Sequence, residues 1–110
     1  MKIVDRKTFL SLPENTLFST YEPQVFGPLE IKGESLPNDF YIQDIASAVA
    51  STGDQNECNI LDDALQTGRS FRMDFNCQGR DGCFESNELY AVWEKEDVES
   101  LISRLQECIK

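Results

Sequence analysis

The stretch LYAVWEKEDVESLISRLQECIK, residues 89–110, carries the clearest fold information in the chain. Its first five residues form an apolar run rich in β-formers, which predicts a strand. From Val98 to Ile109, apolar residues recur every three or four positions, as they do on one face of a helix. Acidic residues crowd the first turns of that segment and Arg104 lies near its end, so both ends complement the helix dipole. The stretch therefore predicts a strand followed by an amphipathic helix packed on a sheet.

Working outward from this stretch, short segments of β-type sequence alternate with turn residues. Strands are predicted at 3–4, 16–22, 29–32, 40–42 and 69–75. In the last of these, Phe71, Met73 and Phe75 point to one side, which favours burial of all three. Residues 45–51 contain many small side chains and suit a helix or a strand, and we interpret them as a continuation of the preceding strand.

Two further helices complete the predicted elements. Asp5 caps a short helix that extends to Leu12, and Asp54 begins a capping-box pattern for a helix that Gly68 ends. Consecutive strands separated by few helices favour an α+β fold over a parallel α/β fold. We therefore expect residues 1–110 to form a single acidic α+β domain, with a mainly antiparallel sheet and two or three helices.

The charge of the chain is its most unusual compositional feature. Twenty acidic residues face ten basic ones with no histidine, which gives a formal net charge of -10. Such a chain repels nucleic acid and anionic membranes, and its basic residues are scattered rather than gathered in a stripe. Without histidine the commonest general base is missing. These features predict a protein that is not an enzyme, needs no cofactor and binds neither nucleic acid nor membrane directly.

Residues 74–85 form the segment that comes nearest to a metal site. Asp74, Asn76, Gln78 and Glu85 fall at ligand positions of a calcium loop, with Gly79 at the turn. That resemblance to an EF-hand is partial, because Gln replaces Asp or Asn and the entering segment alternates like a strand. We interpret the segment as a turn-rich hairpin loop and keep calcium binding as the weaker alternative.

The N-terminus lacks the apolar run of a signal peptide, so the expected location is the cytoplasm, where cysteines stay reduced. Cys58 and Cys108 lie on or beside apolar helix faces and are expected to be buried. Cys77 and Cys83 flank the 74–85 loop at a spacing that permits a disulfide across a hairpin, which would be unusual in a reducing compartment. The wide spacing of the four cysteines argues against a zinc site.

The acidic residues are the strongest remaining functional signal. They cluster at 54–63, 81–88 and 94–99. They either form a solvated surface or face a basic partner, because complementary charge steers association and sets specificity. The expected partner-binding residues are Asp62, Asp63, Asp81, Glu85 and Glu88.

Two stretches resemble small acidic proteins encoded by bacteriophages. These are residues 89–98, with Leu101, Ile102 and Leu105 after them, and the opening Phe9-Leu10-Ser11-Leu12-Pro13. The resemblance covers about a quarter of the chain and identifies no specific family. It implies the class of early phage proteins that includes anti-CRISPR and other anti-defence inhibitors, which often occupy a site on a host protein without catalysis.

Three hypotheses follow. The first is a non-catalytic inhibitor or adaptor that engages a basic surface of a host protein. The second is a small-ligand binder that holds calcium at 74–85, or a signalling nucleotide at a pocket between subunits of a homodimer, for which Arg69, Arg72 and Arg80 are the cations closest together in sequence. The third is a structural or assembly protein.

Overall fold

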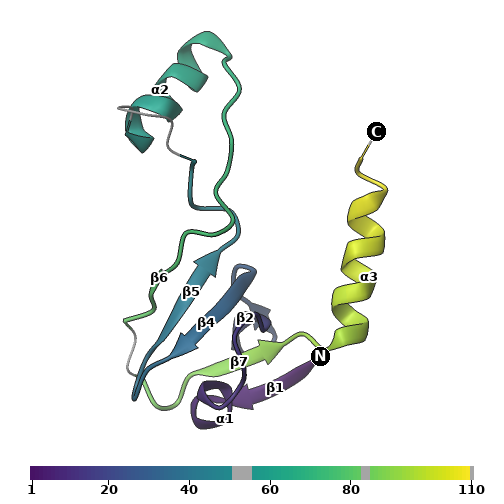
Figure 1. Ribbon diagram of the computed structural model, residues 1–110. Helices are drawn as coiled ribbons and strands as arrows, with labels where there is room; N and C mark the ends of the chain where they lie inside the picture. Colours follow the sequence, from purple (N-terminus) through teal and green to yellow (C-terminus); the bar gives the residue numbers. More distant parts are fainter. Residues whose placement is uncertain (51–55, 83–84, 110) are drawn as a thin grey trace.

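The computed structural model describes residues 1–50, 56–82 and 85–109. It confirms an α+β fold with a mainly antiparallel sheet and a C-terminal helix (Figure 1). The strands are β1 (Lys2–Asp5), β2 (Leu17–Glu22), β3 (Val25–Phe26), β4 (Glu30–Ser35), β5 (Phe40–Asp44), β6 (Gly79–Arg80) and β7 (Leu89–Val92). The helices are α1 (Arg6–Leu10), α2 (Glu57–Thr67) and α3 (Lys95–Gln106).

The sheet runs in the order β1-β7-β2-β4-β5-β6, and β3 pairs with β2 beside this path. Every pair of neighbouring strands is antiparallel. β7 lies between β1 and β2, with Val92 opposite Lys2 on one side and opposite Phe18 on the other. The last strand therefore pairs with both of the first two strands. α3 starts beside the N-terminus (Figure 1).

An aromatic cluster forms the core between α1 and the sheet. Phe9, Phe18, Phe40 and Tyr90 are all buried, and the Phe9 and Tyr90 rings stack at a centroid distance of 4.0 Å. α1 can present Phe9 to the sheet because Asp5 begins the helix, as predicted. The Asp5 carboxylate accepts a hydrogen bond from the Thr8 backbone N–H at 2.8 Å.

The strand predicted at 29–32 exists, but its charged side chains turn toward the core. Lys32 is 1% exposed, and its ammonium group donates to the carbonyl of Gly33 and to the Ser35 hydroxyl, at 3.0 and 2.6 Å. Burial lowers the pKa of Lys32, and Glu14 opposes that effect. Glu30 lies opposite Phe18 in the β2–β4 pair. Alternation identified the strand but gave no sign that its polar side would be buried.

Two predicted strands are wrong. β5 ends at Asp44, a turn follows at 45–47, and 69–75 forms no strand. The two segments contact each other through one bridge between Val49 and Met73, and residue 51 lies outside the described residues. Phe71 and Phe75 are 44% and 57% exposed instead of buried. The alternation is real, but these residues belong to an arm between β5 and β6, formed by residues 45–50 and 56–78, and no other described element covers this arm (Figure 1). The alternation therefore creates no core there.

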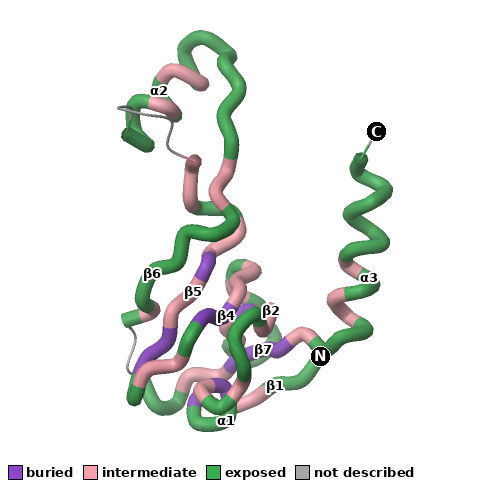
Figure 2. Tube along the Cα trace, in the orientation of Figure 1, coloured by how far each residue is buried: buried purple, intermediate pink, exposed green. Residues whose placement is uncertain are grey.

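α2 sits at the end of this arm. Its N-cap is Asn56, whose side chain accepts a hydrogen bond from the Asn59 backbone N–H at 2.9 Å, so the helix begins after the predicted position. Asp54 itself lies outside the described residues. Gly68 ends the helix as predicted, with a positive φ of 74° that favours glycine. No residue of α2 is buried, and Figure 2 shows exposed or intermediate residues along it.

α3 confirms the amphipathic C-terminal helix, although its packing differs from the prediction. The Glu94 backbone N–H donates to the Asp97 carboxylate at 3.1 Å in a capping box that starts the helix. Val98 and Leu101 are partly buried, whereas Ile102 and Leu105 are 50% and 53% exposed. The helix stands away from the sheet beyond its first turns (Figures 1 and 2).

Candidate functional site

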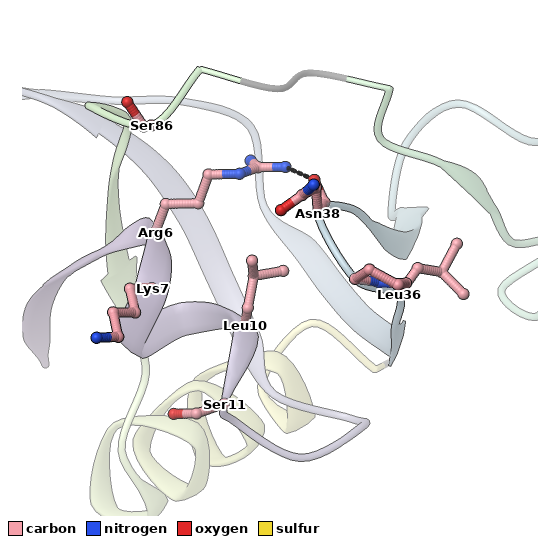
Figure 3. Close-up of a pocket in the computed structure, with 8 residues that line it drawn as sticks. Arg6, Lys7, Leu10, Ser11, Leu36, Asn38 and Ser86 are labelled. Carbon is pink, nitrogen blue, oxygen red and sulfur yellow. Dashed lines mark hydrogen bonds between the residues drawn. The ribbon is translucent and has the colours of Figure 1, made fainter.

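A cavity of about 840 Å³ opens between α1 and the loop that joins β4 to β5 (Figure 3). It is lined by Arg6, Lys7, Leu10, Ser11, Leu36, Pro37, Asn38 and Ser86. Cations, hydroxyls and an amide share this lining with aliphatic side chains. Such a mixture is typical of sites that bind small polar molecules.

Arg6 forms one wall of the cavity and is held from several sides. Its guanidinium donates to the Tyr90 hydroxyl and to the Asn38 carbonyl, each at 2.7 Å, and Figure 3 marks the second bond. The carboxylates of Glu88 and Asp81 lie 3.6 and 3.8 Å from the same guanidinium. Because Arg6 is only 6% exposed, these groups compensate for the loss of its hydration.

Tyr90 extends this network into the core. Its hydroxyl donates to the Glu88 carboxylate at 2.9 Å while it accepts from Arg6. Burial, followed by the hydrogen bond to Glu88, raises the pKa of Tyr90 well above its ordinary value. The phenol therefore stays protonated, and the network joins α1, β7 and the residues before β7 as a fixed unit.

A second ion pair holds the end of the β4–β5 loop that lines the cavity. The Asp39 carboxylate is 1% exposed and accepts hydrogen bonds from Arg80 Nε at 3.0 Å and from the Gly82 backbone N–H at 3.1 Å. Burial works to raise the pKa of Asp39, but hydrogen bonds from Phe40, Gly82 and Arg80 outweigh it and hold that pKa below its usual value. The pair ties β6 to the start of β5.

Glu30 has the most unusual protonation behaviour of the described carboxylates. Burial, followed by the negative charges of Asp44, Asp81 and Glu88, raises the pKa of Glu30 to about 7. Asp44 lies directly opposite Glu30 in the β4–β5 pair. A carboxyl group in this setting changes its protonation state near neutral pH, which makes Glu30 a pH-sensitive group in the sheet.

The predicted acidic site divides into two regions. Asp81 and Glu88 meet at Arg6, and Glu85 is exposed between them in sequence. Asp62 is exposed and Asp63 is partly buried, and both belong to α2. α2 and the start of β7 lie at opposite ends of the molecule (Figure 1). The structure therefore brings together Asp81 and Glu88 but does not bring Asp62 and Asp63 to them.

The 74–85 segment does not have the geometry of an EF-hand. Residues 69–75 are not helical, and Gly79–Arg80 pairs with β5 as a strand. The Asp74 carboxylate accepts a hydrogen bond from the Asn76 backbone N–H at 2.8 Å, as in a turn, while Gln78 lies against Gly33. Glu85 follows two residues that lie outside the described part of the chain. Among the described residues, no group of His, Cys, Asp and Glu could hold a metal ion.

The three arginines considered for a nucleotide do not form one cluster. Arg69 and Arg72 line a small cavity of about 250 Å³ beside α2. Arg80 pairs with Asp39 on β6.

The predicted burial of Cys58 and Cys108 is wrong, because both are exposed and free, as is Cys77. The reason is that no residue of α2 is buried, and that Cys108 follows α3, whose far half is exposed. The suggested bond between Cys77 and Cys83 falls partly outside the described residues.

The sequence predicted no functional role for Arg6, Asp39 or Tyr90. One local signal existed for Arg6, which lies three residues before Phe9 and therefore shares its helix face. The remaining partners come from distant parts of the chain, and no short pattern joins them.

Comparison with known proteins adds no further constraint, since no family model, curated protein or solved structure matches this chain. Within the described residues, the helices are too short and too polar to cross a bilayer.

Proposed function

We propose that this chain is a non-catalytic binding protein that engages a positively charged surface of a host protein in the bacterial cytoplasm, as phage-encoded inhibitors of defence or nucleic-acid-handling proteins do. The observation that carries the proposal is the burial of cations. Arg6 and Lys32 are 6% and 1% exposed, so two of the ten basic residues are withdrawn from the surface. Asp39 is the one buried acidic residue in the described part of the chain, and the surface is therefore even more acidic than the composition.

The location of the exposed carboxylates supports two contact regions. Asp62 on α2 and Glu85 before β7 are exposed, which suits contact with a basic partner. Asp81 and Glu88 offset the charge of the buried Arg6, so their role in partner binding is through the shape and stability of that region. Asp63 is partly buried and lines the small cavity beside α2, so it does not share the exposed face of Asp62.

The experiment compares capture of bacterial proteins by the tagged full chain and by two variants. The test variant carries Asp62→Lys and Glu85→Lys, and the control carries Glu34→Lys, an exposed site on β4. We expect one stoichiometric partner, which the wild-type chain and the control capture and the test variant does not. High salt should release this partner, because screening weakens exposed charge pairs. If the control loses the partner to the same extent, the partner is attracted to negative charge in general, and the proposal is contradicted.

The cavity beside α1 favours a second candidate, the binding of a small anionic molecule such as a signalling nucleotide. Its specific support is that the exposed Lys7 lines a space of about 840 Å³ together with the hydroxyls of Ser11 and Ser86, whereas Arg6 in the same lining is already paired with Asp81 and Glu88. A ligand that binds only the folded chain raises its thermal midpoint. A panel of cyclic nucleotides should therefore raise the midpoint of the wild-type chain and not that of Lys7→Glu, and no shift with any member would remove this candidate.

A further inference from the structure

The chain exposes more surface than a compact monomer of its mass. Its accessible area is 8048 Å², whereas a compact protein of 12.5 kDa exposes about 6,200 Å². The radius of gyration is 16.2 Å, compared with about 13 Å for a compact chain of this length. The difference of about 1,900 Å² exceeds the roughly 800 Å² that each partner buries in a standard interface.

Part of this surface is the far half of α3. Ile102 and Leu105 are 50% and 53% exposed and continue the apolar face that Val98 and Leu101 begin, and Ile109, beyond the end of the helix at Gln106, is 79% exposed. An amphipathic face is normally stabilised by packing rather than by helix propensity. This half of the helix therefore presents an apolar ridge without a cover among the described residues.

A groove lies at the opposite end of the same helix. It has a volume of about 490 Å³ and is lined by Met1, Ser19, Phe26, Trp93, Asp97, Ser100 and Leu101. Phe26 is 61% exposed, and the indole N–H of Trp93 is buried without a hydrogen-bond partner among the described residues. The groove thus offers mainly apolar walls, and the Trp93 N–H lies buried rather than on the groove surface.

We propose that two copies of the chain form a two-fold dimer in which the exposed end of each α3 packs into the groove at the base of the partner's α3. The ridge is at the C-terminal end of the helix and the groove at its N-terminal end, so only antiparallel helices can fill both grooves at once. Such an exchange is isologous, as in most homodimers. Each copy supplies the ridge that the other copy's groove lacks.

The charges along α3 agree with this orientation. Glu94, Glu96 and Asp97 gather at the groove end, where the N-terminal ammonium group binds Glu94 and Asp97. The half that enters the partner's groove carries Arg104, which pairs with Glu107 at 3.2 Å. Because these two charges cancel, antiparallel pairing brings no net charge from the described residues of this half toward the acidic end of the other helix, and it opposes the two helix dipoles. The net charge of -10 on each copy still repels the other copy at long range. Salt should therefore strengthen this dimer, whereas it should weaken binding to a basic partner.

The experiment is sedimentation velocity on the full chain at micromolar concentrations in low and high salt. The test variant is Leu105→Asp on the exposed ridge, and the matched control is Ser103→Asp on the other side of the same exposed helix half. We expect a dimer that tightens with salt, that Leu105→Asp weakens about thirtyfold or more, and that Ser103→Asp leaves intact. A second variant, Phe26→Asp, changes the groove and should have the effect of Leu105→Asp.

Circular dichroism checks that each variant keeps its helices and sheet. A monomer at every concentration and salt overturns the proposal, as does a dimer that both Leu105→Asp and Phe26→Asp leave unchanged. Open-ended large oligomers also overturn it and would favour an assembly protein. If Leu105→Asp is monomeric but still captures the salt-sensitive host partner, the dimer stands as a feature separate from the proposed function. If the wild-type chain is a dimer but captures no host partner, only the proposed function is rejected.

Discussion

Replacing Glu30 by glutamine should stabilise the protein at alkaline pH and have little effect at acidic pH. In the folded chain, burial and three nearby carboxylates raise the pKa of Glu30 from 4.5 to about 7. The folded state therefore holds this proton more tightly than the unfolded state does. As pH rises from 4.5 through about 7, Glu30 must ionise against its surroundings, and stability is lost across that window.

The size of the effect follows from the shift and from the exposure of the side chain. Each pKa unit corresponds to about 1.4 kcal/mol of differential interaction. Glu30 is partly exposed, so solvent screening reduces the full value, and we expect about 1–2 kcal/mol. A glutamine side chain cannot ionise, so the Glu30→Gln variant should exceed the wild-type free energy of unfolding by this amount at about pH 8 and match it at about pH 4.5.

Urea unfolding at several pH values, followed by Trp93 fluorescence and circular dichroism, measures this difference directly. Glu34→Gln is the matched control, because Glu34 is exposed on the same strand and should change stability by less than about 0.5 kcal/mol at either pH. A Glu30→Gln variant that shows the same difference at both pH values, or that is less stable than wild type at about pH 8, would refute the reasoning.

Four further substitutions test the core, the arm and the Arg6 network by urea unfolding at neutral pH. Arg6→Met should lower the free energy of unfolding by about 3–5 kcal/mol, because it leaves two carboxylates beside the core without their cation. An unchanged unfolding midpoint would mean that the network adds no stability. Tyr90→Phe should cost about 1–3 kcal/mol, since it removes the hydroxyl that joins an arginine and a glutamate; a neutral result would contradict the bridging role. Phe9→Ala should cost about 3–5 kcal/mol. Phe71→Ala should lower the free energy of unfolding by less than about 0.5 kcal/mol. If Phe71→Ala and Phe9→Ala lowered it by similar amounts, Phe71 would be buried, as the sequence predicted.

Local sequence patterns specify several elements of this protein directly. Asp5 at the start of α1, Gly68 at the end of α2 and the apolar period of α3 depend on interactions within a few residues, so their patterns can be read directly. The strand at 89–92 and the α+β class follow from the same local preferences. The acidic surface follows from composition, because most charged side chains must remain in water.

Which face of each element is covered depends on contacts between distant segments of the chain. Phe71 and Phe75 alternate as a half-buried strand would, but no other element in the described part of the chain covers their segment, and they stay exposed. Lys32 alternates as a solvent-facing residue would, yet β4 turns it into the core. The Arg6 network likewise joins groups up to 84 residues apart. Burial and ion pairing are set by contacts between distant segments, and a local period records only which residues share a side, not what covers that side.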